Sequence, residues 1–203
     1  MATTLDLTPN DLRVLTNIFD TPPPPLIDST LPPDPHISSS LLPSLKSTER
    51  LAIAAAEASD LPTAHSLLLT LTSMHPNYAS GFNNLAQVLR LISAPIEDII
   101  AALDTSISLA APKDGGSVSA SQANLLKMAY TQRGALWYGE WKKTGEEACE
   151  ERARRDFEEG GRWGSGVARE MAVRTNPYAR LCGAIVKEAL TREYMGQGGV
   201  CGK

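Results

Sequence analysis

The stretch Leu51-Ala52-Ile53-Ala54-Ala55 is matched 34 residues later by Leu85-Ala86-Gln87-Val88-Leu89. A fixed period of this length is typical of helix-turn-helix repeats that stack into a solenoid. The alanine of each copy falls where two helices would cross, because a small side chain lets the two backbones approach closely. The spacing therefore predicts an all-α solenoid, and it favours the binding of partners over catalysis.

Three units of this kind follow one another along the chain. Each fits the tetratricopeptide pattern, in which bulky, leucine, small and aromatic positions mark the first helix, and alanine and an aromatic mark the second. In the third unit Ala153 follows Gly134 by 19 positions, where about 12 are usual, so we expect a lengthened helix end and loop within 138–147. The units carry Leu51-Ala52 with Ala64 and Leu68, Leu85-Ala86 with Ile99 and Leu103, and Arg133-Gly134 with Ala153 and Phe157.

Proline content and charge patterning divide the rest of the chain. Repeated prolines and serines between 20 and 44 predict a linker of extended or disordered character. The helix expected before it docks either on the solenoid or on another protein, and the sequence leaves both open. We expect an N-terminal amphipathic helix (1–20), the Pro/Ser-rich linker (21–44), three repeats (45–78, 79–112 and 119–163, together 45–163), C-terminal capping helices (164–196) and a flexible tail (197–203).

Start signals place individual helices within these segments. Ser119 and Gln122 have the spacing of a capping box, and Asn176-Pro177 combines a strong N-cap residue with a proline suited to the first helical position. The C-terminal helices are expected to form a capping hairpin, because open solenoid ends need a helix with one polar face. Helices are predicted over 46–58, 61–73, 78–92, 96–109, 119–141, 145–160, 165–173 and 177–195.

Composition narrows the functional classes. The net charge of −4 implies neither nucleic acid nor an anionic membrane, and the arginines at 152, 154 and 155 stand among glutamates, as in a salt-bridged helix face. Three widely spaced cysteines favour reduced thiols in a reducing compartment. We therefore expect a cytoplasmic monomer, small enough to enter the nucleus, that binds no nucleic acid, membrane, metal or cofactor.

The C-terminal block carries a more specific likeness. The segment Asn176-Pro177-Tyr178-Ala179-Arg180-Leu181-Cys182, with Ala153-Arg154-Arg155-Asp156-Phe157-Glu158 before it, resembles the tetratricopeptide repeat protein 36 family. So do Asn83-Asn84-Leu85-Ala86-Gln87 and Gln132-Arg133-Gly134. The resemblance implies three repeats, no catalytic activity and an adaptor or co-chaperone role, with links to the seventy-kilodalton heat-shock chaperones and to tyrosine metabolism.

A groove along the first helices of the repeats is the expected binding surface. Repeats that grip a chaperone's C-terminal carboxylates need lysine, arginine and asparagine there, because buried carboxylates require charge-assisted hydrogen bonds. Among the positions where such repeats carry these residues, only Asn84 has the required side chain. A neutral or mildly acidic protein segment therefore suits the groove better than a strongly charged one. Ordinary solvated helix surface is the alternative interpretation. The predicted groove residues are Arg50, Ile53, Asn84, Gln87, Gln132 and Ala135.

Two functions fit these observations. One is a non-catalytic scaffold or adaptor, associated with a heat-shock chaperone through the family resemblance. The other is a regulator of the stability of a metabolic enzyme, for which tyrosine breakdown is the candidate at family level. Trp141, beyond the third repeat pattern, either covers the expanded loop or marks a second partner surface.

Overall fold

A computed structural model describes residues 25–112 and 116–197. Within these residues the chain forms eight helices and one isolated bridge between Ile27 and Val118. The helices are α2 (Leu42–Glu57), α3 (Leu61–Met74), α4 (Ala79–Leu91), α5 (Ile96–Ala110), α6 (Ala120–Thr144), α7 (Glu147–Arg162), α8 (Gly166–Thr175) and α9 (Pro177–Gln197). The predicted N-terminal helix lies outside the described residues.

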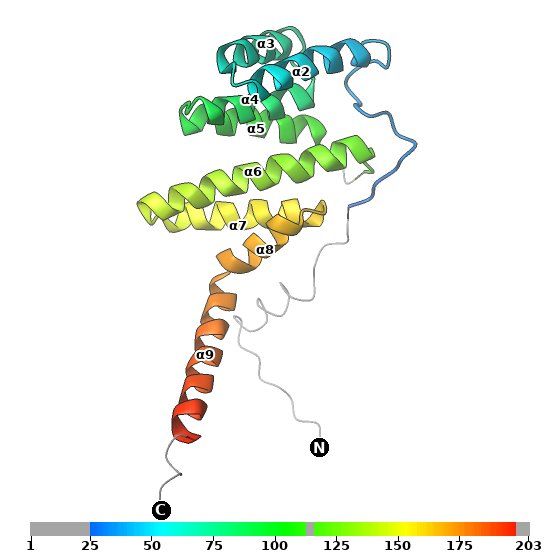
Figure 1. Ribbon diagram of the computed structural model, residues 1–203. Helices are drawn as coiled ribbons and strands as arrows, with labels where there is room; N and C mark the ends of the chain where they lie inside the picture. Colours follow the sequence, from blue (N-terminus) through cyan, green and yellow to red (C-terminus); the bar gives the residue numbers. More distant parts are fainter. Residues whose placement is uncertain (1–24, 113–115, 198–203) are drawn as a thin grey trace, which may run out of the picture.

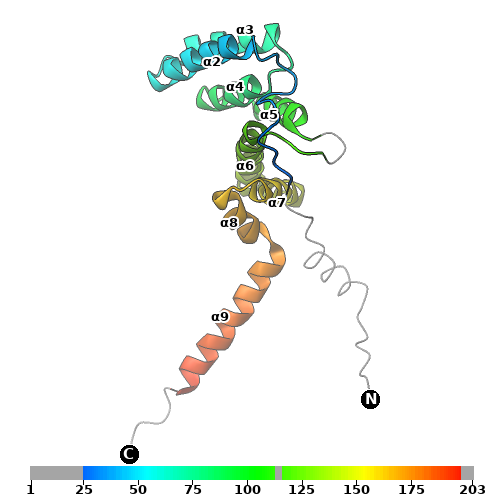
Figure 2. The ribbon, with the colours of Figure 1, turned by 90° about the vertical axis from the view of Figure 1, so that its right-hand side faces the viewer.

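The helices stack in antiparallel pairs, as the predicted all-α solenoid requires (Figure 1). Each helix from α2 to α8 packs chiefly on its neighbours in the sequence. The first helices of the three repeats are α2, α4 and α6, and α4 contacts both of the others. A second view, turned by 90°, shows the same succession of pairs (Figure 2). The solenoid is therefore confirmed, and α2, α4 and α6 form one continuous side of it, which we call the A-helix face.

Local sequence fixes the helix ends. Ser119 and Gln122 form the predicted capping box, each side chain bonding the backbone of the other residue. Asp60 caps α3 through the Thr63 amide at 3.2 Å, and Asn176 caps α9 through the Tyr178 amide at 2.9 Å. The helix α2 begins earlier than predicted, because Pro43 occupies its first turn, where the missing N–H costs nothing.

The small residues of the repeat pattern lie at the helix crossings. Ala52 and Ala86 are fully buried, and Gly134 lies so close to Phe157 that a Cβ atom would stand 2.9 Å from its ring. Leu51 departs from the pattern, because it is 61% exposed whereas Leu85 is buried. The reason is its place in the stack: no described repeat precedes α2 to cover that side.

The linker is extended but ordered against the repeats. Val118 exchanges backbone hydrogen bonds with the linker at Leu26 and Asp28, and Ser119 Oγ donates to the Pro33 carbonyl at 3.1 Å. His36 Nε2 lies 3.2 Å from the carbonyl oxygen of Leu109 at the end of α5. Residues 26–36 thus run across the α5–α6 connection, so this part of the linker is a strap on the solenoid and not a free tether.

The C-terminal helices differ from one another. Buried Gly160 and Gly161 fall inside α7. A Cβ atom at Gly160 would meet Thr131 of α6 at 2.9 Å, and one at Gly161 would meet Arg169 of α8 at 2.8 Å, so the glycines let α6 and α8 pack closely on α7. The next helix, α9, contacts only α8 among the described elements and projects away from the stack (Figure 1). The capping role predicted for the hairpin therefore falls to α8. No described helix has the length and hydropathy needed to cross a bilayer.

Candidate protein-binding site

The predicted groove residues all lie on the A-helix face. Arg50, Ile53 and Ala135 are exposed there, on α2 and α6. The three amide side chains are half-buried, which means that part of their bonding capacity is directed into the protein. These are Asn84 and Gln87 on α4 and Gln132 on α6.

A buried carboxylate that the sequence analysis did not select organises the first two repeats. Glu49 on α2 is only 8% exposed. Its Oε2 accepts a hydrogen bond from the Tyr78 hydroxyl at 2.8 Å, and its Oε1 accepts bonds from the Ser80 hydroxyl and, at 2.5 Å, from the Asn84 amide. All three donors are neutral, so no formal positive charge pairs with this buried carboxylate within the described residues. Burial, followed by the proximity of Glu49, raises the pKa of Tyr78 well above its usual range.

Two of the three amides in the predicted groove bond a side chain of a neighbouring helix. Asn84 bonds Glu49 across α2 and α4, and Gln132 Nε2 donates to the Asn83 Oδ1 at 3.0 Å across α4 and α6. Asn83 is almost fully buried. The surface left for a partner is then made by exposed residues beside these bonds, chiefly Arg50, Ile53 and Ala135.

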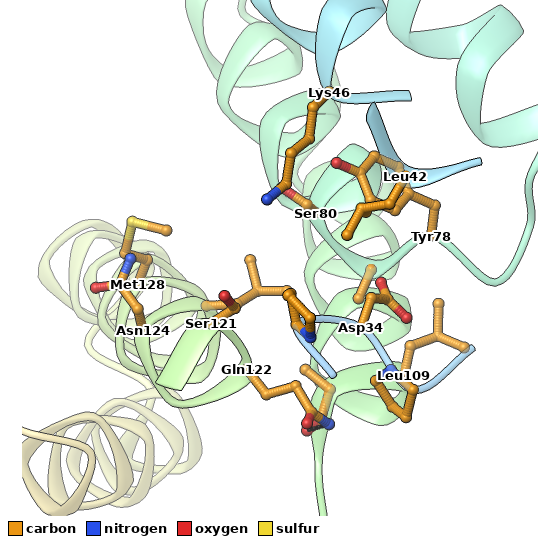
Figure 3. Close-up of a pocket in the computed structure, with 15 residues that line it drawn as sticks. Asp34, Leu42, Lys46, Tyr78, Ser80, Leu109, Ser121, Gln122, Asn124 and Met128 are labelled. Carbon is orange, nitrogen blue, oxygen red and sulfur yellow. Dashed lines mark hydrogen bonds between the residues drawn. The ribbon is translucent and has the colours of Figure 1, made fainter. Parts of the chain in front are cut away.

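A pocket of about 220 Å³ lies at the N-terminal end of the A-helix face (Figure 3). The linker segment 33–35 forms one wall, and the beginnings of α2, α4 and α6 together with the end of α5 form the others. Cavities that hold whole small molecules are usually about 300–1,000 Å³, so this volume suits one side chain of a partner better than a substrate. Its polar lining consists of Asp34, Lys46, Tyr78, Ser80, Ser121, Gln122 and Asn124.

The pocket carries one charged group of each sign. Asp34 on the linker is half-buried, and burial raises its pKa, although a hydrogen bond from the His36 amide at 2.8 Å opposes this. Lys46 enters from α2, and no ion pair within 4.0 Å joins it to Asp34. The pocket thus combines a mainly apolar lining with a few polar groups whose formal charges balance, and Glu49 lies behind its Tyr78 and Ser80 wall.

The third repeat is held by a different polar contact. Arg133 on α6 donates two hydrogen bonds to Asp156 on α7, at 2.8 and 2.6 Å, and one to Asp104 on α5 at 2.6 Å. Burial opposes the charge on Arg133, but the hydrogen bonds that it donates to Asp156 and Asp104, and the charges of those carboxylates, outweigh burial and raise its pKa. Burial likewise raises the pKa of Asp156, an effect that Arg133 opposes. This guanidinium is committed to joining three helices.

The aromatic residues at the end of α6 contact their own hairpin. The ring centroids of Tyr138 and Trp141 are 5.5 Å apart, and Lys142 Nζ lies 4.3 Å from the Trp141 ring. Arg152 of α7 lies over Trp137 at 4.7 Å. Trp141 is half-buried by these neighbours. The contacts favour the first of its two predicted roles, which is to cover the expanded turn.

Neither a metal site nor a catalytic constellation assembles around these residues. In residues 25–112 and 116–197 no group of three His, Cys, Asp or Glu side chains is arranged to hold a metal ion. The pocket's titratable groups are Asp34, Lys46 and Tyr78, and none of them is hydrogen-bonded to a nucleophile in an activating arrangement.

No protein-family model matches the chain, but comparison with individual known proteins identifies its family. The chain is 35% identical to the L-tyrosine degradation gene cluster protein hmgX of Aspergillus fumigatus, over 94% of both chains. It is 32% identical to human tetratricopeptide repeat protein 36, over 90% of this chain and 94% of the human protein. The zebrafish (Danio rerio) protein of the same name is 34% identical over 78% of this chain and 76% of its own. The chain therefore belongs to the tetratricopeptide repeat protein 36 family.

Proposed function

We propose that this protein is a non-catalytic adaptor that binds a segment of another protein on the A-helix face. The observation that carries the proposal is the composition of that face: exposed Ile53 and Ala135 lie on the same adjoining helices whose beginnings line a side-chain-sized pocket. Repeat solenoids present such surfaces to extended partner segments. The family relationship supports the same class of role.

The charges on the A-helix face determine which charge is favourable on the partner segment. Glu49 occupies the position where carboxylate-gripping repeats carry a lysine, and its buried charge disfavours a partner carboxylate nearby. Asp34 adds a second acid beside the pocket, balanced in sign by Lys46. A neutral segment with one apolar or amide side chain suits this lining. A heat-shock chaperone partner would bind by a segment other than its C-terminal carboxylate.

Proximity labelling in the native cell tests the adaptor proposal. The double variant Ile53→Glu and Ala135→Glu adds two charges to exposed positions of the A-helix face, so the fold should be retained. Leu69→Glu is the matched control, because Leu69 is also exposed but lies on α3, a second helix of its repeat. We expect the double variant to lose specific neighbours that the wild type and the control keep. Identical labelling by all three proteins would contradict the proposal.

A second function rests on the name of the relative in Aspergillus fumigatus, which assigns that protein to a tyrosine degradation gene cluster. We propose that the bound partner is an enzyme of tyrosine breakdown whose stability the adaptor controls. Deleting the protein should shorten the lifetime of one such enzyme in a cycloheximide chase, and the wild type should restore it while the double variant does not. Recovery of a chaperone that its own C-terminal peptide displaces would instead support the clamp type of adaptor.

A further inference from the structure

The strap (26–36) is held against the repeats by few contacts. None of its side chains is buried, and eight of its eleven residues are exposed. Val118, which bonds the strap through its backbone, is a fully buried apolar residue adjoining it. Segments with few buried apolar contacts open at a lower free energy than the core, so the strap should detach while the repeats stay folded. Among the described residues, four hydrogen bonds join the strap to the repeats, and they are made at Leu26, Asp28, Pro33 and His36.

The strap also forms one side of the pocket. It runs along an edge of the stack between the beginnings of α2 and α6 (Figure 1). Its residues 33–35 line the pocket, and Figure 3 shows Asp34 on the strap and Lys46 on α2 at different sides of it. With this wall in place the pocket has a volume of about 220 Å³, which is room for one side chain. Displacing the strap opens the pocket along this edge, so that an extended segment can pass over the beginning of α6.

One half-buried charge opposes the closed position of the strap. Burial raises the pKa of Asp34, which means that its carboxylate is less favourable here than in water. The hydrogen bond from the His36 amide to Asp34 Oδ1, at 2.8 Å, offsets only part of this cost. Lys46 lines the same pocket, but no ion pair within 4.0 Å joins it to Asp34. The closed strap is therefore held by its four hydrogen bonds against an unfavourable charge.

From these observations we propose that the strap is a gate on the pocket. It opens as one unit while the repeats stay folded, and when closed it limits what the A-helix face can bind. The inference rests on the proposed function, because that function places the partner segment at this pocket. Only molecules with an open strap then accept an extended segment along the whole face. The apparent affinity for the partner is therefore scaled by the fraction of molecules that are open, and a looser strap gives tighter binding.

Hydrogen exchange followed by NMR on the full chain tests the opening without any partner. The reporters are the Asp28 and Val118 amides, which donate the two backbone hydrogen bonds between the strap and the α5–α6 connection. Relative to their intrinsic rates, we expect both to exchange at least about a hundredfold faster than the amide of Leu126, in the core of α6. Exchange as slow as that of Leu126 would show that the strap opens only with the repeats, and it would overturn the gate.

Two strap variants should shift this opening in opposite directions. His36→Ala removes the bond to the Leu109 carbonyl, at the far end of the strap from the two reporters, and should speed their exchange about fivefold. Asp34→Asn keeps an acceptor for the His36 amide but removes the half-buried charge, and should slow their exchange. His65→Ala, at a half-buried histidine of α3, is the matched control and should leave both rates unchanged. An unaltered rate at both reporters in His36→Ala would contradict opening as one unit.

Proximity labelling connects the gate to binding. The readout is the set of neighbours that the wild type labels and the double variant Ile53→Glu and Ala135→Glu loses. His36→Ala should label these neighbours up to about fivefold more strongly, in proportion to the open fraction. Weaker labelling by His36→Ala would show that the strap is part of the binding surface, which would overturn the gate and leave the adaptor in place. A double variant that loses no neighbour would contradict the proposed function itself, a result that the exchange experiment cannot produce.

Discussion

The first and third repeats each bury a carboxylate between helices, but they satisfy it differently. Glu49 in the first repeat meets three neutral donors, from Tyr78, Ser80 and Asn84. Asp156 in the third repeat meets the guanidinium of Arg133 through two hydrogen bonds. Both carboxylates are more than nine-tenths buried. The third repeat therefore neutralises its buried acid internally, whereas the first leaves a negative charge behind the pocket wall.

The two buried carboxylates therefore differ in their surroundings: the one in the third repeat belongs to an ion pair between helices, and the one in the first repeat lies behind the pocket proposed to bind a partner. Arg133 is held by Asp156 and Asp104, so its charge is used within α5, α6 and α7. Hydrogen bonds from neutral groups stabilise Glu49 without cancelling its charge, and the resulting field extends to the neighbouring pocket. We infer that the third repeat gives the solenoid rigidity, while the first repeat determines which partner segments it accepts.

The largest expected effect concerns packing in the third repeat. Phe157 is 2% exposed and fills the space that Gly134 leaves. Phe157→Ala should lower the free energy of unfolding by about 3–5 kcal/mol. Leu68→Ala, at the equivalent position of the first repeat, should cost about 2–4 kcal/mol. Urea denaturation of both variants checks the order, and a larger loss at Leu68 would reverse our ranking of the two repeats.

The next effect concerns the charged junction. Asp156→Ala leaves Arg133 with only Asp104, whose side chain is half exposed. Breaking a buried ion pair costs about 3–5 kcal/mol, and we expect about 2–3 kcal/mol here because Arg133 is partly exposed and keeps one partner. Chemical denaturation gives the value. The double variant Asp156→Ala and Arg133→Met should recover part of the loss, and no recovery would show that the charge of Arg133 is not the cause.

A smaller effect is expected when the charge of Glu49 is removed. Tyr78 bonds one oxygen of Glu49, whereas Ser80 and Asn84 bond the other. Glu49→Gln replaces one of these acceptor oxygens by an NH2 group, so stability should fall by about 1 kcal/mol. The pKa of Tyr78 should fall as well, because the neighbouring charge is lost. Ultraviolet titration of tyrosine ionisation measures that pKa. An unchanged titration would contradict the contribution of Glu49 to the raised pKa of Tyr78.

The smallest effect appears as a dependence on alkaline pH. The pKa of Tyr78 is raised by burial and then by Glu49, and that of Tyr130 by burial and then by Glu159. Each phenol keeps its proton longer in the folded than in the unfolded state, so the contribution of these two tyrosines to stability is constant below about pH 10 and declines above it. The decline is at most about 1.4 kcal/mol per pH unit for each tyrosine. Tyr78→Phe should lessen the slope of unfolding free energy between about pH 10 and 11 without abolishing it, because the pKa values of Tyr130 and Cys149 are raised as well. An unaltered slope would exclude Tyr78 as a source.

The sequence was sufficient for the features that follow from local rules. The 34-residue period predicted the buried positions of Ala52 and Ala86, and the tetratricopeptide pattern of the third unit predicted that of Phe157. The capping box at Ser119 placed the start of α6 to within one residue. These features depend on residues near one another in the chain or on a pattern repeated along it. The family resemblance on residues 176–182 agreed with the later comparisons.

The features that sequence reasoning missed depend on contacts distant in the chain. Glu49 was not selected from the sequence, because the donors that bond its carboxylate lie 29–35 residues away in the chain. The linker looked free because proline patterns do not reveal that Val118 and Ser119 bond to it. Gly160 and Gly161 were predicted to end the helix, because a pair of glycines is typical of a turn. The sequence alone does not distinguish such a turn from glycines that are required by close packing inside a helix.

Double-mutant cycles on the two carboxylates provide the most direct test of their separate roles. The coupling free energy between Arg133 and Asp156, with both replaced by alanine singly and together, should be about 3 kcal/mol. The coupling between Glu49 and Tyr78, measured with Glu49→Gln and Tyr78→Phe, should be about 1–2 kcal/mol, because its donor is neutral. An equal or larger value for Glu49 and Tyr78 would contradict the distinction between a neutralised junction and a charged, open one.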